Sequence, residues 1–519
     1  MSFLLDSFIY ASSAFSIIIA IAIYMILKED GKATGYKGLL PVIFSIVVLT
    51  LAFSYFYISP KTYNIAITEF PPWFSPAVIK INVGDTIKWI HEETPDVMKA
   101  SFSPFEIDIF PVVMANEGHS NQHTGHIHTH PIMSLQGPEN FSSNFEPVDE
   151  FSFTFNKPGI YVYICPTHPY MKGIIAVGVN TDQEITWPPK ESTILDPPKI
   201  PGIGEIWVDT QFEVVVGQKF PGTITVIDAN TWKVKKTIID TDFNNPHNLW
   251  NSIDGDFIYQ TQWHSNKLSK IDVDKKSIVG TIDVGIAPAH VFVHPTKDKI
   301  YVTLNDEDKI IVVNSSLQLV NSIKTPLGPH GLWIEPSGKY MSVAATLSGE
   351  LAIIDLEKEE VIKTFDVGGL PLASSITSDG KYAAISSLLN GKVVIVDLRS
   401  IEIVKDINVG SMPIQVVPSP DGKYFFVANT GSSDVSVIDT GTLDMVKTLP
   451  AFKGAHGITF GKKEGGGYYA YVSNKYARAV VVIDVDSLDV AGHIKLSDNG
   501  WGGNGILALP NTATGFWNE

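Results

Sequence analysis

The chain of 519 residues is too long for one ordinary hydrophobic core, so we expect two or more domains. Its formal net charge of −17 argues against a nucleic-acid partner, because no basic face is available to neutralise phosphates. The single cysteine, Cys165, excludes an intrachain disulfide scaffold, four-thiolate zinc and iron–sulfur ligation.

Two apolar runs open the chain, at residues 8–27 and 39–58, and each is long enough to cross a bilayer as a helix. A cleaved signal peptide is the alternative for the first run, but no positive charge precedes it and a second run follows at once. The loop between the runs carries three lysines, which the positive-inside rule assigns to the cytoplasm. We therefore predict a two-helix transmembrane hairpin over residues 1–60, with the main domains outside the cytoplasm at the cell membrane.

Cys165, His168 and Met171 lie in one stretch of the form Cys-x-x-His-x-x-Met, directly after the apolar run 160–164. A thiolate, an imidazole and a thioether are the soft ligands of a mononuclear blue-copper centre, which needs a second imidazole from elsewhere in the chain. A buried structural cysteine with chance neighbours is the alternative. The spacing and the preceding strand favour a type 1 copper site.

Short apolar stretches separated by Gly and Pro turn signals predict an all-β sandwich over residues 61–180. Within it, residues 84–89 and 153–165 resemble the pattern of the cupredoxin family. The first stretch carries its Gly-Asp-Thr before a Trp, and the second its Phe-x-Phe-x-x-Pro-Gly before the Cys. The resemblance covers nearly the whole segment and implies a cupredoxin fold with type 1 copper.

The resemblance to cupredoxins also implies the rest of the ligand set. Met171 would be the weak axial ligand. The second imidazole would be His130, which best matches the family's His-x-x-x-Ser strand, with His128 as second choice and His91 as third. A long insertion precedes this strand, and five of the thirteen residues 118–130 are histidine. That composition indicates either a further metal site or a solvated loop with one ligand at its end.

Two helices followed by a cupredoxin also resemble the architecture of subunit II of haem–copper oxidases. The dinuclear copper centre of that family needs two cysteines four residues apart, and Tyr161 stands at the matching position here. The family's ligand histidine would fall on Lys99. A dinuclear centre is therefore excluded.

A proline-rich segment at 181–203 predicts a stiff extended linker. After it, a repeat of about 40 residues indicates a propeller. Seven strands that end in Asp or Asn define the register of the repeats, at 224–228, 268–272, 310–314, 351–355, 393–397, 435–439 and 481–484. The repeats resemble the YVTN β-propeller family, for example at Tyr301-Val302-Thr303. We predict a seven-bladed propeller over 204–519, closed by the C-terminal piece 505–509.

The starts of the inner strands carry four histidines when the repeats are aligned. The aligned positions are His247, His290, His330, Leu372, Ile414, His456 and Asn504. Because inner strands line the axial channel, these side chains would face a common point, and imidazoles suit copper, zinc or iron. His264 could lean over the same end, and Asn504 is a further candidate ligand. Repeated structural histidines that cap turns are the alternative.

This ring resembles the propeller of nitrous oxide reductase, in Ala289-His290 and in Pro329-His330-Gly331-Leu332-Trp333. The resemblance implies a copper oxidoreductase in which type 1 copper exchanges electrons with one or two metal ions in the channel, and nitrogen oxides or oxygen as substrates. The alternative is a non-catalytic blue-copper carrier whose propeller docks on a respiratory membrane complex. The predicted partners are a redox protein or such a complex and the lipid bilayer, with a homodimer by analogy.

Overall fold

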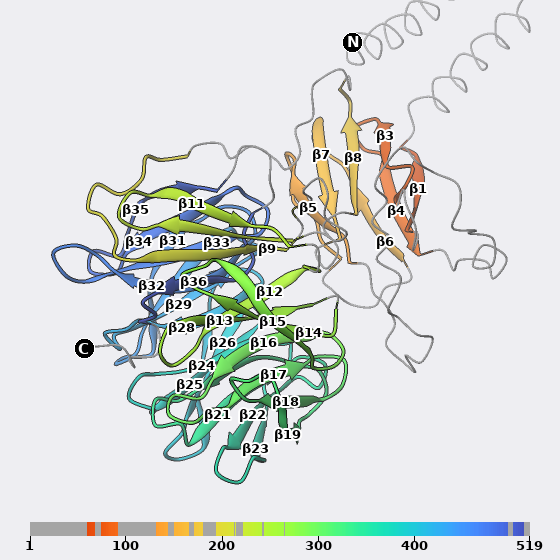
Figure 1. The fold of residues 1–519 in the computed structure, drawn as a ribbon. Coiled ribbons are helices and arrows are strands. Elements are labelled where there is room, and N and C mark those ends of the chain that lie inside the picture. The colour runs from red at the N-terminus through yellow and green to blue at the C-terminus, as the bar shows by residue number, and fades with distance from the viewer. Residues whose placement is uncertain are drawn as a thin grey trace, which may run out of the picture. The chain divides into compact units, whose positions relative to one another are not determined.

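The computed structural model describes residues 60–67, 74–91, 131–143, 150–165, 171–179, 194–211, 213, 222–240, 243–263, 265–496 and 502–512. They belong to two compact units, one ending near residue 185 and the other comprising the C-terminal part of the chain. All regular elements in these ranges are β-strands (Figure 1). The prediction of a mainly β protein is confirmed.

The first unit contains two four-stranded sheets. One has the order β2(Phe74–Ser75), β1(Thr62–Ile67), β4(Thr86–His91), β6(Glu150–Thr154), and the other β3(Val78–Ile81), β8(Lys172–Val177), β7(Gly159–Ile164), β5(Met133–Gln136). The β1–β4 and β3–β8 pairs are parallel, and the other pairs are antiparallel. Side chains from both sheets share one core, in which Trp89 of β4 meets Tyr163 of β7 edge to face at 5.2 Å. The unit is therefore a two-sheet sandwich.

The second unit contains seven antiparallel four-stranded sheets among its described residues. Blade one pairs β36(Ile506–Leu509), β9(Glu205–Thr210), β10(Thr223–Asp228) and β11(Lys233–Ile238). The other six blades follow in chain order, from inner to outer strand: β12(Pro246–Asn251) to β15(Ser277–Asp283), β16(Pro288–Val293) to β19(Leu319–Lys324), β20(Pro329–Ile334) to β23(Glu360–Asp366), β24(Pro371–Ile376) to β27(Glu402–Asn408), β28(Pro413–Pro418) to β31(Asp444–Pro450), and β32(Ala455–Lys462) to β35(Asp489–Lys495).

The middle strands of these six blades complete the sheets: β13(Phe257–Gln262) and β14(Lys267–Asp272), β17(Ile300–Leu304) and β18(Lys309–Val313), β21(Tyr340–Ala345) and β22(Glu350–Asp355), β25(Tyr382–Ser387) and β26(Lys392–Asp397), β29(Tyr424–Asn429) and β30(Asp434–Asp439), and β33(Tyr468–Asn474) and β34(Ala479–Asp484). In blades three to seven they read as largely apolar runs and are mostly buried, because both faces of each blade pack on a neighbouring blade. The outer strands are largely exposed.

The ring of blades is closed by the C-terminal strand. β36 pairs antiparallel with β9, so blade one combines the last strand of the chain with the first three of the repeat region. The inner strands β36, β12, β16, β20, β24, β28 and β32 each contact the next around the ring (Figure 1). The predicted seven-bladed propeller with this closure is confirmed, and the inner edge of each blade is short and faces the channel.

The described part of the proline-rich segment is held on the propeller. The amide of Leu195 donates to His493 Nδ1 at 2.8 Å, the indole of Trp232 donates to the Pro198 carbonyl at 2.9 Å, and the Tyr469 hydroxyl donates to the Ile200 carbonyl at 3.0 Å. The segment from residue 194 onward is therefore a strap on the propeller surface and not a free spacer.

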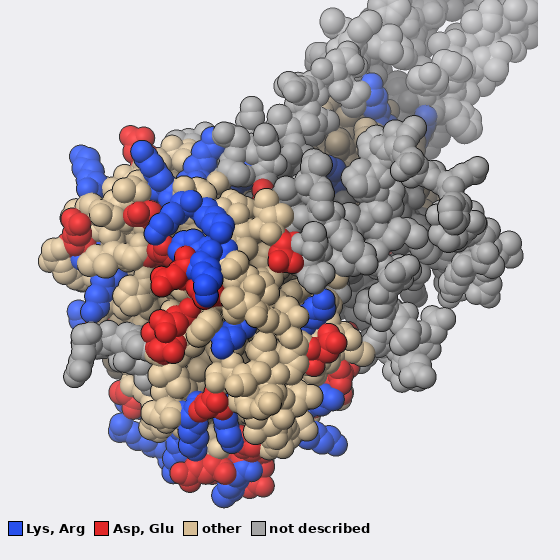
Figure 2. Space-filling view, viewed as in Figure 1, with Lys and Arg blue, Asp and Glu red and all other residues tan. Residues whose placement is uncertain are grey.

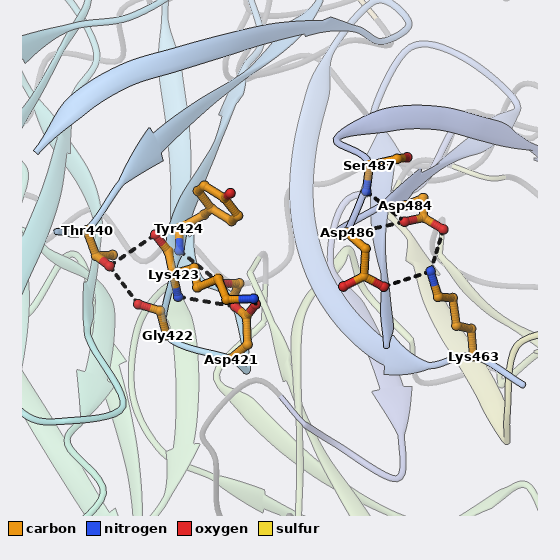
Figure 3. A network of polar contacts seen from close by, with 10 residues as sticks. Asp421, Gly422, Lys423, Tyr424, Thr440, Lys463, Asp484, Asp486 and Ser487 are labelled. Atoms are coloured by element: carbon orange, nitrogen blue, oxygen red, sulfur yellow. Dashed lines mark hydrogen bonds and ion pairs between the residues drawn. The ribbon is translucent and has the colours of Figure 1, made fainter. Parts of the chain in front are cut away.

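Charges of both signs alternate over the propeller surface (Figure 2). Ion pairs join outer strands of neighbouring blades, as between Lys405 and Asp444 at 2.6 Å. At the turns opposite the start of the inner strands, Lys463 contacts both Asp484 and Asp486, and Thr440 donates to the Gly422 carbonyl (Figure 3). An exposed pair such as that of Lys405 and Asp444 contributes little, ~0–1 kcal/mol.

Within the ranges described above, no helix has the length and apolarity needed to cross a membrane. The two predicted spans, at 8–27 and 39–58, lie outside those ranges.

Candidate metal centre in the propeller channel

The inner strands begin with a shared turn. A residue in the left-handed conformation precedes the first residue of the strand, which is proline in five blades. These residues are Asn245 (φ 57°), Ala287 (φ 51°), Gly328 (φ 70°), Leu370 (φ 57°), Met412 (φ 55°) and Gly454 (φ 76°). Most side chains avoid this conformation, so its recurrence marks a turn imposed by the fold. The turn directs the first residues of each inner strand toward the channel.

A β-bulge follows each of these turns. The pairing register shifts between Pro246 and Asn248 in blade two, between Pro288 and Val291 in blade three, and between Pro329 and Leu332 in blade four. A bulge sets two residues of one strand against one residue of its partner and re-aims their side chains. The first and the second residue after the proline can therefore both face the channel.

The structure corrects the alignment of the four histidines. His247 and His330 directly follow their prolines, and His456 directly follows Ala455 at the equivalent place. His290 is the second residue after Pro288, which pairs with Leu304 just as Pro246 pairs with Gln262. The position equivalent to His247 is thus Ala289, and His290 reaches the channel from one residue further along the bulge.

Three of the histidines nevertheless converge. One ring nitrogen from each of His247, His290 and His330 lies within 4.8 Å of the other two. The ring centroids are 5.6 Å apart for His247 and His290, 5.4 Å for His247 and His330, and 4.8 Å for His290 and His330. We call these three residues the histidine cluster. His456 lies at its edge, with its ring 6.3 Å from that of His247.

Hydrogen bonds distinguish two members of the cluster. His330 Nδ1 lies 2.8 Å from the Leu372 carbonyl, which can only accept, so Nδ1 carries the hydrogen and Nε2 has a free electron pair. His247 Nδ1 lies 3.0 Å from Asn504 Nδ2, whose amide also donates to the His247 carbonyl. This arrangement makes His247 Nδ1 the acceptor, and a neutral His247 then carries its hydrogen on Nε2.

Two buried polar atoms around His247 have no partner among the described residues: His247 Nε2 and Asn504 Oδ1. An unpaired buried polar group costs roughly 1–3 kcal/mol, so such atoms mark a place for a ligand or an ion. If the Asn504 amide turned over, Oδ1 would accept from His247 Nδ1–H and Nε2 would become free to bind a metal, but the bond to the His247 carbonyl would be lost. Asn504 thus contacts His247 and sets its tautomer.

The imidazoles of the channel are neutral at neutral pH. Burial lowers the pKa of His330 to about 4, and burial also holds the pKa values of His247, His290 and His456 well below the ordinary value. The nearby positive charge of Lys475 lowers the pKa of His330 and His456 further. Neutral imidazoles offer electron pairs, which is the state that metal binding requires.

Two neighbours of the cluster were missed by the sequence analysis. The indole of Trp263 lies 4.7 Å from the His247 ring and 5.5 Å from the His330 ring, between centroids. Asp209 is fully buried and accepts from the Gly505 amide at 2.6 Å, and burial raises its pKa to about 8. Neither residue stands out from the repeat pattern, so no sequence signal identified them.

The predicted copper ligands of the first unit are only partly described. Cys165 and Met171 are both buried in the sandwich core, and the Cys165 amide donates to the Met171 carbonyl at 3.1 Å. His91 ends β4, but its side chain lies outside the described residues. His128, His130 and His168, the histidine-rich stretch 118–130 and the propeller's His264 also lie outside them.

The fold and the cluster define the C-terminal unit as a seven-bladed β-propeller with an imidazole-lined channel. Residues 337–465, from blade four into blade seven, match the family described as "Cytochrome D1 heme domain". No curated protein matches the chain.

Solved structures with a similar fold include Kuenenia stuttgartiensis hydrazine synthase, at 19% identity and TM-score 0.46, over 59% of this chain and 99% of that one. Another is the dihydro-heme d1 dehydrogenase NirN, at 16% identity and TM-score 0.44, over 63% and 73% of the two chains. A functionally unknown protein from Desulfotomaculum acetoxidans has 16% identity and TM-score 0.47, over 59% and 98%. Likenesses this distant carry no functional argument.

The match to a haem domain contradicts the predicted copper functions. A copper oxidoreductase like nitrous oxide reductase and a blue-copper electron carrier are both wrong on this finding, and so is copper as the cofactor of either unit. The physical reason for the error lies in the donor atoms. Imidazole is a common ligand of iron as well as of copper and zinc, so a ring of histidines does not identify the metal.

Proposed function

We propose that the propeller holds a redox-active iron centre at the end of the channel where the inner strands begin, and that the chain is an oxidoreductase acting there on a small molecule. The observation that carries the proposal is the convergence of three neutral imidazoles, two of them buried and that of His290 half-buried, within 4.8 Å of one another. The match of residues 337–465 to a haem domain supports iron as the metal.

A haem does not fit among these histidines. Haem iron takes one or two axial protein ligands, and His330 alone would suit that role, since its Nδ1 is anchored on a carbonyl. The three ring centroids, however, are only 4.8–5.6 Å apart, which leaves no room for a macrocycle between them. The donors therefore suit iron, whereas the space among them does not admit a porphyrin.

Direct ligation by the cluster agrees better with this geometry. Metal–imidazole bonds of about 2.0–2.1 Å need nitrogens closer together than 4.8 Å, which rotation of the side chains can supply. Three ligands on one side of a metal leave positions open for a substrate. Bound iron would supply one-electron redox chemistry at those positions.

The chain's own residues would control this chemistry through the surroundings of the metal. The Leu372 carbonyl orients His330, and Asn504 orients His247, as partners beyond the ligands do in metal sites. Trp263 packs against the His247 and His330 rings and restricts their rotation.

We further propose, from the apolar runs at 8–27 and 39–58, that the chain is anchored in the cell membrane with both units outside the cytoplasm. A redox protein or a membrane respiratory complex would then exchange electrons with the iron, and the chain would work as a homodimer. Residues 1–60, 61–180, 181–203 and 204–519 remain our proposed division into hairpin, sandwich, linker segment and propeller.

The experiment is iron analysis of the purified full-length chain together with a pyridine haemochrome assay. We expect about one iron per chain without a haemochrome signal, and loss of that iron in His330→Ala and His247→Ala. His294→Ala is the matched control. This buried histidine bonds the Gly338 carbonyl at 3.0 Å away from the cluster, so its loss should leave the iron in place. A stoichiometric haemochrome signal, or iron retained in both cluster variants, would refute the proposal.

A further inference from the structure

A cavity lies in the channel next to the histidine cluster. Its lining comes from the inner strands of blades two to six, and its volume is about 20 Å³, which is enough for a water molecule or a guest of similar width. His290 belongs both to the cluster and to the cavity wall. A molecule in the cavity would therefore lie beside a metal held by the cluster.

Two amide side chains in the wall are held in the same way. Asn248 Oδ1 accepts from the Val291 amide at 3.1 Å, and Gln415 Oε1 accepts from the Ile458 amide. Because a backbone N–H can only donate, these contacts fix which atom of each side chain is the oxygen. Among the described residues, neither side-chain NH₂ group has a hydrogen-bond acceptor, so both remain available to a guest.

The rest of the wall favours a guest that is rich in acceptors. Trp250, Phe292 and Trp333 pack together there, with the Trp250 and Phe292 rings stacked at 3.9 Å, and no carboxylate is among the lining residues. Hydrogen bonds from N–H groups are stronger in such an apolar setting than in water. The cavity thus combines two free NH₂ groups with low polarity and, when the cluster is filled, a neighbouring cation.

We propose that this cavity binds a small monovalent anion between the NH₂ groups of Asn248 and Gln415 and the metal of the histidine cluster. The proposal rests on the iron centre proposed above and names the substrate class of that centre. Hydrogen bonds from the amides would orient the anion, and the positive charge of the metal would attract it. The anion would then lie beside those coordination positions of the metal that face the cavity. A water molecule is the competing occupant, since polar cavities of this kind commonly hold one.

Isosteric variants test the two amides without removing their structural role. Gln415→Glu and Asn248→Asp keep the oxygen that accepts from Ile458 or Val291, and they replace the NH₂ donor by a carboxylate oxygen. Calorimetric titration of azide and of formate into the full-length, iron-loaded protein is the measurement. We expect each variant to bind these anions at least about tenfold more weakly than the parent, with unchanged iron content.

Gln318→Glu is the control, because this side chain accepts from Asn314 in an exposed turn of the outer strands. It should bind azide like the parent. Variants that bind within about twofold of the parent, or a parent that binds neither anion, would overturn the anion site and leave a cavity for water only. Iron content is read on the same samples. If the protein holds no iron but binds azide in a way that depends on the two amides, the iron centre is refuted and the anion site stands. If the protein holds iron but its azide binding does not depend on the amides, the anion site is refuted and the iron centre stands.

Discussion

Blades four and five of the propeller share one backbone and differ in chemistry. Both begin with a left-handed residue, a proline and a bulge, but the next residue is His330 in blade four and Leu372 in blade five. Leu372 still takes part in the site, because its carbonyl accepts from His330 Nδ1. The repeat therefore supplies positions, and the residues at those positions decide which blades offer imidazole nitrogens to the channel.

The largest expected effect is a difference in iron affinity between substitutions in these two blades. His330→Ala removes an electron-pair donor and should weaken iron binding at least a hundredfold, whereas Leu372→Ala keeps the carbonyl and should leave iron affinity nearly unchanged. Iron affinity from competition with a chelator is the measurement. Equal losses in both variants would mean that the channel wall as a whole, and not the imidazole, retains the metal.

The pH dependence of stability provides the second test. Burial lowers the pKa of His330 to about 4 in the metal-free folded state. In the unfolded chain this histidine is protonated below about pH 6.5, whereas in the folded state it stays neutral until about pH 4. Stability attributed to this histidine is therefore lost as pH falls from about 6.5 to 4, by on the order of 3 kcal/mol.

His330→Leu makes blade four resemble blade five and should remove this part of the pH dependence. Melting temperatures of the metal-free parent and variant between pH 7 and pH 4 are the measurement. A parent whose melting temperature falls no more steeply than that of the variant would contradict the assignment of a buried neutral imidazole.

A smaller effect is expected at Asn504. Asn504→Asp would accept from His247 Nδ1–H, which frees Nε2 for the metal and strengthens it as a ligand, so iron affinity should rise about tenfold. Asn230→Asp, in the exposed β10–β11 turn, is the control and should have no effect. Unchanged affinity in Asn504→Asp would show that the tautomer of His247 does not limit iron binding.

The smallest effect is expected on the outer strands, which are largely exposed. Lys447 and Asp489 form an exposed ion pair at 2.8 Å between blades six and seven. Lys447→Ala should change the free energy of unfolding by less than about 0.5 kcal/mol, because solvent screens the pair. Chemical denaturation is the measurement, and a loss above about 1 kcal/mol would mean that the outer strands help to hold the ring.

The ring of blades could be predicted from the sequence because the repeat length is visible in the spacing of similar strands. Strands ending in Asp recur about every 40 residues, and the missing inner strand of blade one implied closure by residues 505–509, which β36 confirms. The convergence of histidines followed from equivalent positions on inner strands. The register of His290 did not, because His290 is the second residue after its proline, whereas His247 and His330 directly follow theirs.

The cofactor and the surroundings of the site could not be predicted from the sequence as well as the ring of blades. Cys165, Met171 and the channel histidines suggested copper because their donor atoms suit it, but donor type alone does not select a metal. The tautomers of His330 and His247 depend on Leu372 and Asn504, whose contacts cross between blades. Such contacts join residues far apart in the chain, and only the folded structure reveals them.

Iron K-edge absorption of the iron-loaded full-length chain tests the central claim most directly. Direct ligation by the cluster predicts nitrogen neighbours at about 2.1 Å, close to the metal–imidazole distances found for zinc, with the outer-shell scattering of three imidazole rings. His330→Ala should lower that imidazole count. A spectrum dominated by four pyrrole nitrogens, or one without imidazole scattering, would contradict the account.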